Sequence, residues 1–159
     1  LAEEKNVYSI GVMKGSSIAY TYPPRSNQFL RGFDLQKNPE QRQIIQQVMQ
    51  WATQTRQTVL IGPIQLGKGG TGFVSFTPIF VTPPNGNPGS GPLWGFVTTT
   101  VKPSVLYRQA GLFDEKANLN YALRRQDGLG KTNEVFFGEE SLFEQNPVTL
   151  KIPLPNATW

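Results

Sequence analysis

Hydrophobic residues are concentrated in three consecutive runs between Thr58 and Lys102. Each run is rich in β-branched and aromatic residues and is bounded by turn residues, which is typical of antiparallel strands. The first connection is the glycine-rich hexapeptide Gly67–Gly72, and the second, Pro83–Pro92, holds four prolines and three glycines. The pattern therefore predicts three strands, joined by a short hairpin turn and by a long mobile loop.

A hairpin and a helix are predicted before these strands. Asn6–Met13 and Ser17–Tyr22 have strand composition and are separated by a short turn around Gly15. Asn38 and Pro39 are a good cap and first residue for a helix that we expect to end near Arg56. The helix carries one apolar stripe, formed by Ile44, Ile45, Val48, Met49 and Ala52. This stripe is suited to covering one face of a sheet, and Arg25–Phe33, which shows no periodicity, is expected to be a crossing loop.

After the central strands the pattern predicts smaller elements. A short helix begins at Pro103 and ends near Gly111, and the segments Asn120–Arg125, Val135–Phe137 and Val148–Leu154 have the composition of short strands. We therefore predict an α+β fold with a PAS-like, antiparallel five-stranded sheet and a helix inserted after its second strand. Residues 1–102 would form a ligand-binding subdomain with a concave pocket, and residues 103–159 a connecting helix and a smaller, partial second PAS-like β subdomain.

Composition excludes several kinds of chemistry. The 159 residues contain no histidine and no cysteine, which excludes histidine-based triads, cysteine nucleophiles and ordinary zinc sites. The net charge is +4, but the basic residues are scattered, so we expect no nucleic-acid partner. No run approaches the roughly 20 apolar residues that span a bilayer. Because the chain starts at Leu1 without a signal peptide, we expect a fragment of a larger protein. We expect no cofactor, no metal and no enzymatic activity.

Candidate binding residues lie in the predicted pocket region. Asp34 is an acid among apolar neighbours, which fits either a pocket carboxylate that accepts hydrogen bonds from a ligand or a loop cap paired with Arg31 or Arg42. The hexapeptide that contains Lys68 could bind an anion, but it joins two strands and lacks phosphate-loop spacing, which favours a hairpin turn. The acidic pairs Asp114-Glu115 and Glu139-Glu140 are expected to be solvated surface.

A series of short motifs resembles the CHASE domain. In chain order they include G-F-D-L from Gly32, N-P-E-Q-R from Asn38, T-V-L-I-G-P from Thr58, L-W-G-F-V from Leu93 and V-F-F-G from Val135. Each motif is weak alone, but together they run through nearly the whole chain. The resemblance implies an extracytoplasmic ligand sensor of a membrane receptor. Such receptors pass the signal to a histidine kinase of a two-component system or to a cyclase or phosphodiesterase for cyclic di-GMP.

The resemblance also implies where a ligand lies. In the plant cytokinin receptors of this family, an aspartate before the inserted helix and backbone groups of a leucine contact the ligand, and Asp34 and Leu60 stand at the matching places. Glycines and a threonine of the hexapeptide are expected to rim the pocket, and strand aromatics and a threonine to line it. The predicted ligand contacts are Asp34, Leu60, Gly70, Thr71, Phe76, Phe96 and Thr98.

The leading hypothesis is a periplasmic or extracellular sensory domain that binds an unknown small molecule. The full-length protein is then expected to be anchored in the inner membrane and to form a homodimer. A structural or protein-interaction domain with a filled core is the alternative. A third hypothesis, an anion- or nucleotide-handling enzyme built around Lys68, predicts stabilisation by phosphate.

Overall fold

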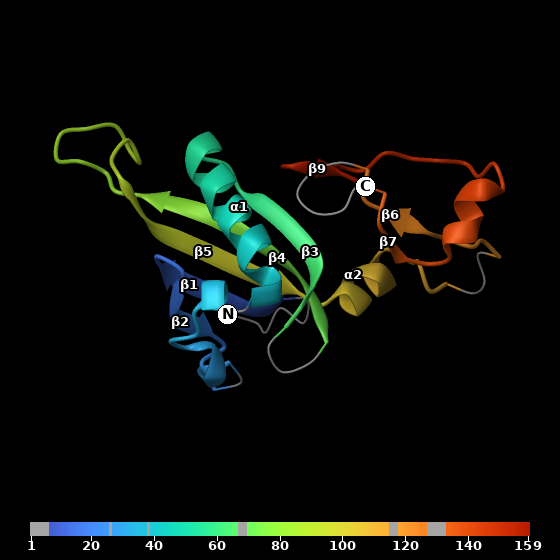
Figure 1. Cartoon of the computed structure of the whole chain (residues 1–159), viewed down its shortest axis with the longest axis horizontal. Coiled ribbons are helices and arrows are strands. Elements are labelled where there is room, and N and C mark those ends of the chain that lie inside the picture. The colour runs from blue at the N-terminus through green and yellow to red at the C-terminus, as the bar shows by residue number, and fades with distance from the viewer. Residues whose placement is uncertain (1–6, 26, 38, 67–69, 115–117, 127–132) are drawn as a thin grey trace.

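Five strands form one antiparallel sheet, as the sequence predicts (Figure 1). The computed structural model describes residues 7–25, 27–37, 39–66, 70–114, 118–126 and 133–159. The sheet has the order β2-β1-β5-β4-β3. Its strands are β1 (Val7–Lys14), β2 (Ser17–Tyr22), β3 (Val59–Gln65), β4 (Thr71–Phe80) and β5 (Leu93–Val101). The α+β class and the five-stranded sheet are confirmed, whereas the PAS-like description and the division at residue 102 stay predictions.

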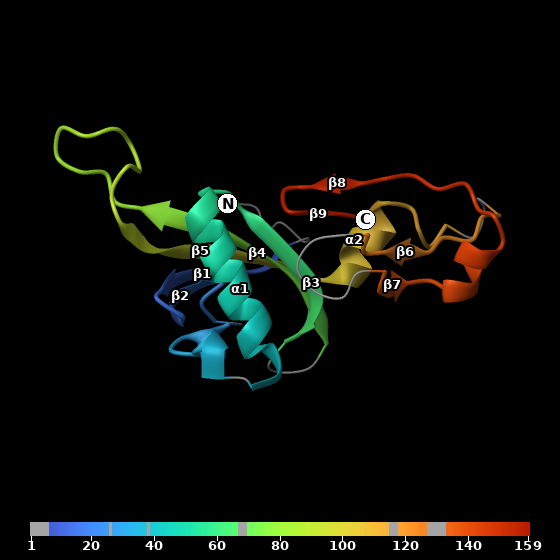
Figure 2. The same cartoon turned by 45° about the horizontal axis from the view of Figure 1, so that its top comes forward.

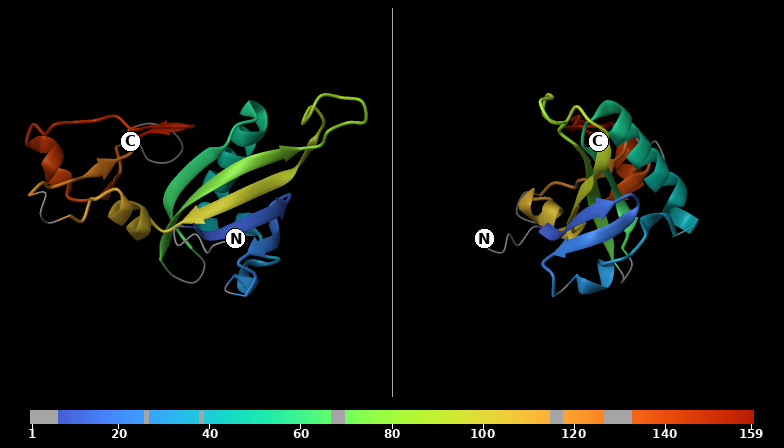
Figure 3. Two further views of the ribbon diagram at one scale, coloured as in Figure 1. Left: turned by 180° about the vertical axis from the view of Figure 1, so that it is seen from behind. Right: turned by 90° about the vertical axis from the view of Figure 1, so that its left-hand side faces the viewer.

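Helix α1 (Pro39–Thr55) lies across one face of this sheet, and Figure 3 shows the arrangement from behind and from the side. Its predicted apolar stripe is confirmed, because Ile45, Val48 and Ala52 are fully buried against the sheet. Across the interface, Phe76 of β4 and Phe96 of β5 are also fully buried, and their rings meet edge to face at 6.5 Å between centroids. This packing forms the core of the domain.

The segment between β2 and α1 is more ordered than the expected loop. It contains two 3-10 turns, η1 (Gln28–Leu30) and η2 (Leu35–Lys37). Both backbone groups of Ile18 in β2 are hydrogen-bonded to this segment. The Ile18 N–H donates to the Phe33 carbonyl, and the Ile18 carbonyl accepts from the Gly32 N–H. These bonds hold the segment against the edge of β2, which hydrophobic periodicity alone does not reveal.

After the sheet, the predicted strand Val135–Phe137 is confirmed, whereas the other two predicted strands are much shorter than the sequence predicts. The elements of this part are α2 (Pro103–Gln109), β6 (Leu123–Arg124), β7 (Val135–Phe137), η4 (Glu140–Glu144), β8 (Pro153–Leu154) and β9 (Ala157–Thr158), which lie beside β3 in Figure 2. Only the last two residues of the predicted strand Val148–Leu154 are in a strand. Val148 and Leu150 are 95% and 82% exposed, so neither is covered by the described part of the chain. Strand composition is insufficient here because a strand needs a paired and partly buried face. The described residues contain no helix long and apolar enough to cross a membrane.

An aromatic cluster joins these later elements to the sheet. Phe73 of β4 points away from α1, and its ring contacts Tyr107 of α2, Phe136 of β7 and Trp159, with centroid distances of 6.2, 5.9 and 4.9 Å. Aromatic pairs at these separations stabilise beyond the area that they bury. The cluster therefore packs α2, β7 and Trp159 against β4, and Figure 1 shows the later elements beside the sheet, past β3.

The Tyr107 hydroxyl in this cluster gives the first testable prediction. It is buried without a hydrogen-bond partner among the described residues, and its burial raises the pKa of Tyr107 to about 12. An unpaired buried hydroxyl costs free energy, so Tyr107→Phe should leave the free energy of unfolding unchanged or raise it. Tyr107→Ala, the control, removes the ring and should lower it by about 3–5 kcal/mol. Urea unfolding of the three proteins measures both effects, and a loss above about 1 kcal/mol in Tyr107→Phe would show that the hydroxyl has a partner.

Candidate functional site

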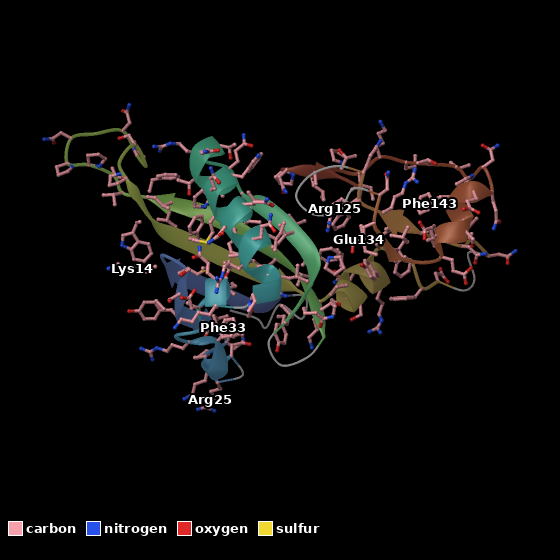
Figure 4. All side chains as sticks on the ribbon, viewed as in Figure 1. Lys14, Arg25, Phe33, Arg125, Glu134 and Phe143 are labelled. Atoms are coloured by element: carbon pink, nitrogen blue, oxygen red, sulfur yellow. The ribbon has the colours of Figure 1, made fainter. Side chains whose placement is uncertain are left out.

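A cavity of about 130 Å³ lies between the sheet, the N-terminal half of α1 and the segment with η1 and η2. Its floor is formed by β1, β4 and β5, which are neighbours in the sheet. Its walls come from α1, from Phe33 (labelled in Figure 4) and Leu35, and from the end of β3. The cavity is therefore located where the inserted helix and the preceding segment meet the sheet, which is the location that the sequence predicts for a pocket.

The floor of the cavity consists of two rows of paired residues. In one row Thr100 of β5 lies between Ser9 of β1 and Val74 of β4. In the next row Thr98 of β5 lies between Gly11 and Phe76. Residues paired across neighbouring strands point to the same face of a sheet, so each row presents its side chains to α1. The floor thus combines hydroxyl groups with apolar side chains.

The Thr98 side chain lies directly against Gly11 on this floor. A Cβ atom at Gly11 would come within 2.6 Å of the Thr98 Oγ1, closer than real side chains approach one another. Gly72 similarly lets the side chain of Leu66, which lines the cavity, pack closely, because a Cβ atom at Gly72 would lie 2.9 Å from the Leu66 Cδ1. The placement of two lining side chains, Thr98 and Leu66, consequently depends on neighbouring positions that lack a Cβ atom.

The walls of the cavity are mainly apolar, and one side-chain amide, that of Gln41, links two of them. Ile45 of α1 and Ile64 and Leu66 at the end of β3 supply apolar surface. The Gln41 side chain donates a hydrogen bond of 2.8 Å to the Gln65 carbonyl, which links α1 to the end of β3 beside the cavity. A mostly apolar cavity with a few polar groups is typical of a small-molecule site.

Two of the predicted ligand contacts, Phe76 and Thr98, line this cavity, and the other five lie outside its lining. Phe96 lies behind Phe76 in the core. Gly70 and Thr71 lie at the start of β4 and are exposed. The phosphate interpretation of the hexapeptide concerns Lys68, which lies outside the described residues. A contact between these five residues and a ligand stays a prediction.

Asp34 lies next to the cavity wall, but its carboxylate is part of a turn. Its Oδ1 accepts a hydrogen bond of 3.0 Å from the Gln36 N–H. A hydrogen bond from the Ser16 side chain is the main cause that lowers the pKa of Asp34, and the Gln36 N–H adds to it. The flanking residues Phe33 and Leu35 line the cavity, whereas Asp34 does not. The structure therefore places the carboxylate in the capping arrangement that the sequence left open as its alternative.

Leu60 lies on the outer edge of the sheet, where its backbone is bonded to Asn156. The Leu60 N–H donates to the Asn156 Oδ1 at 2.7 Å, and the Asn156 Nδ2 donates to the Leu60 carbonyl at 3.0 Å. One side-chain amide thus replaces the neighbouring strand that the edge of β3 lacks. The backbone groups of Leu60 are engaged in this contact and do not face the cavity.

A second contact on the same edge involves Arg125. Its side chain is buried, and its guanidinium donates at 2.6 Å to the Gly62 carbonyl and at 3.2 Å to Glu134 (Figure 4). Gly62 has a φ of 129°, and the pairing of β3 with β4 shifts register between Ile61 and Ile64. The register shift lies between two parts of β3. Leu60, before it, and Gly62, within it, make the edge contacts, and Ile64, after it, lines the cavity.

The sequence interpretation missed Ser9, Gly11 and Thr100 in the cavity and Asn156 and Arg125 at the edge of β3. Alternation along the strands was a usable signal for the cavity, because Ser9 and Gly11 share one face of β1, and Thr98 and Thr100 share one face of β5. The edge contacts carry no local signal, since they join residues 63 and 96 positions apart in the chain. Among the described residues, no group of acidic side chains could hold a metal ion.

The comparisons with known proteins agree with this fold. The CHASE domain family matches residues 7–137, and this chain belongs to that family. A solved structure, the extracellular ligand binding receptor from Desulfohalobium retbaense DSM5692, has a TM-score of 0.51 at 18% sequence identity. The similarity covers 86% of this chain and 22% of that receptor chain, so this chain spans only about a fifth of it. A search of proteins with curated functions found no match.

Replacement of Asn156 tests the contact at the edge of β3. Asn156→Ala leaves the Leu60 N–H and carbonyl without their partner and should lower the free energy of unfolding by about 1–3 kcal/mol. It should also accelerate hydrogen exchange at the Leu60 amide. Asn87→Ala, in the exposed loop between β4 and β5, is the matched control and should change stability by less than about 0.5 kcal/mol. Unchanged exchange at Leu60 in Asn156→Ala would contradict the contact.

The turn at Asp34 predicts a pH dependence. Because the folded protein lowers the pKa of Asp34 below its usual value of 3.8, the ionised carboxylate stabilises the fold above that pH. This stabilisation is lost as the pH falls through the lowered pKa. Ser16→Ala, which removes the main cause, should move the pKa of Asp34 back toward its usual value. An NMR titration of the Asp34 carboxyl in both proteins measures this shift, and identical titration curves would contradict the contact with Ser16.

Proposed function

We propose that this chain is the extracytoplasmic ligand-sensing domain of a transmembrane signalling receptor and has no enzymatic activity of its own. The observation that carries the proposal is the cavity beneath α1, in a chain that belongs to the CHASE domain family. The printed description of the similar solved structure, an extracellular ligand binding receptor, supports the same role and location. Two strands, a helix and three further strands follow one another as in a PAS-like sensory fold, which supports that description of residues 1–102.

The contacts of β3 support a route for the signal. Ile64 and Leu66, at the end of this strand, line the cavity, while Leu60 and Gly62 bind Asn156 and Arg125 on its outer edge. A ligand that moves the end of β3 would change these contacts and so the position of the C-terminal segment. Signalling requires that the ligand binds two arrangements of the protein with different affinities.

The remaining features of the proposal concern the whole receptor. Residues 103–159 would form a connecting helix and a second, membrane-proximal subdomain that passes the signal toward the membrane. The receptor would be a homodimer anchored in the inner membrane, with a histidine kinase or a cyclic di-GMP cyclase or phosphodiesterase as its output. The small molecule would be its partner in the periplasm or outside the cell, and nucleic acid would not.

A thermal-shift screen tests the proposal. Purines, amino acids, carboxylates, amides and short peptides are added to the purified chain, and the midpoint of thermal unfolding is measured. A ligand present at 100 times its dissociation constant should stabilise the fold by about 2.7 kcal/mol. Gly11→Val should abolish the effect, because Gly11 lines the cavity and its new side chain would displace the Thr98 hydroxyl on the floor.

Val12→Ile is the matched control, since Val12 is the next residue of β1 and does not line the cavity. It should respond to the ligand as the parent protein does. If no compound stabilises the parent protein, or if Gly11→Val responds equally, the proposed cavity function is wrong. The first of these outcomes would favour the alternative, a structural or protein-interaction domain.

A further inference from the structure

Three hydroxyl groups on the floor of the cavity lack strong hydrogen-bond partners among the described residues. Ser9, Thr98 and Thr100 are 5%, 6% and 8% exposed. The Thr98 Oγ1 donates to the Gly11 carbonyl over a long distance of 3.5 Å, and no side-chain hydrogen bond is made by Ser9 or Thr100 within the described residues. Buried hydroxyls are normally bonded, because an unpaired one costs about 1–3 kcal/mol. These three groups therefore offer hydrogen bonds to a molecule in the cavity.

Ionised side chains are absent from the described lining of the cavity. Asp34 lies between the wall residues Phe33 and Leu35 in the sequence. Its carboxylate accepts hydrogen bonds from the Ser16 side chain and the Gln36 N–H. The guanidinium of Arg42 donates to the Gln36 carbonyl at 2.8 Å and also lies outside the lining. A charged ligand would lose its hydration in this cavity without gaining an opposite charge from the described lining, which disfavours its binding.

The volume of the cavity limits the size of the ligand. Its 130 Å³ is close to the ~150 Å³ of an engineered apolar cavity that binds benzene. Val74 and Phe76 on the floor and Ile45 on α1 provide apolar contacts for a ring of this size. One ring with a small polar substituent therefore matches the volume, the apolar walls and the hydroxyl groups together.

We propose that the cavity binds an uncharged molecule about the size of one six-membered ring, whose amide or hydroxyl substituent is recognised by Ser9, Thr98 and Thr100. This inference rests on the proposed sensory function and specifies the chemical class of its ligand. Recognition comes from neutral hydroxyls on β1 and β5, and it does not depend on the carboxylate of Asp34.

Three one-ring probes that differ in charge test this inference. Benzamide is neutral, benzoate is an anion and benzylammonium is a cation at pH 7. Each is titrated into the ¹⁵N-labelled chain, and the dissociation constant is taken from the amide chemical shifts of the floor residues. Benzamide should bind with saturation and at least tenfold more tightly than either ion, and Gly11→Val should abolish its binding.

Substitutions of the hydroxyl groups test how the substituent is recognised. Ser9→Ala and Thr100→Val keep the approximate shape of the side chains and should each weaken benzamide binding threefold or more. Toluene, which has no polar substituent, should bind these variants as it binds the parent chain. Thr99→Val is the matched control, because Thr99 is the neighbouring residue of β5 and lies outside the cavity lining. It should bind benzamide as the parent does.

The outcomes separate this inference from the proposed function. A charged probe that binds in the cavity as tightly as benzamide would overturn the neutral class and keep the sensory function. Unchanged benzamide binding in both hydroxyl variants would overturn the recognition by hydroxyls. Failure of benzamide, together with a cavity ligand of another class from the thermal-shift screen, would overturn the inference alone. Failure of every compound in both experiments would overturn the inference and the proposed function together.

Discussion

The unpaired backbone groups on the outer edge of β3 determine where the C-terminal segment packs. An edge strand exposes backbone N–H and carbonyl groups that must find partners. Here Asn156 bonds to both groups of Leu60, and Arg125 bonds to the carbonyl of Gly62. These contacts attach the C-terminal segment to the sheet, and the end of the same strand forms part of the cavity wall. One strand therefore connects the candidate binding site with the last residues of the chain.

The face of the sheet under α1 is divided between packing and binding. Ile45, Val48 and Ala52 fill the core against Phe76 and Phe96, which stabilises the fold. Beside this core lies the cavity, and on its floor the hydroxyls of Ser9, Thr98 and Thr100 replace apolar side chains. A cavity and weakly bonded buried hydroxyls both lower the stability of the fold. Departures of this kind from good packing are found at functional sites.

The fold was predictable where local pattern determines structure. The apolar stripe of α1, the hairpin of β1 and β2 and the three central strands all follow from periodicity and turn residues. The extent of the late strands was not predictable, because Val148 and Leu150 have strand composition but no partner in the described chain.

The candidate site was predictable in its location and only partly in its residues. Phe76 and Thr98 were found from strand alternation, and the same argument could have found Ser9 and Thr100. The turn that holds the Asp34 carboxylate depends on Ser16, and the position of Leu60 at the sheet edge depends on Asn156. Both depend on contacts between distant segments or on side-chain geometry, which a single sequence does not reveal.

The proposed function requires that the ligand binds in the cavity beneath α1. A crystal structure of the protein bound to the compound that stabilises it most tests this claim directly. We expect the compound to lie between Ile45 and the floor formed by Ser9, Thr98 and Thr100, with a polar group within hydrogen-bond distance of at least one hydroxyl. A compound bound elsewhere, with the cavity filled by the protein's own side chains, would contradict it.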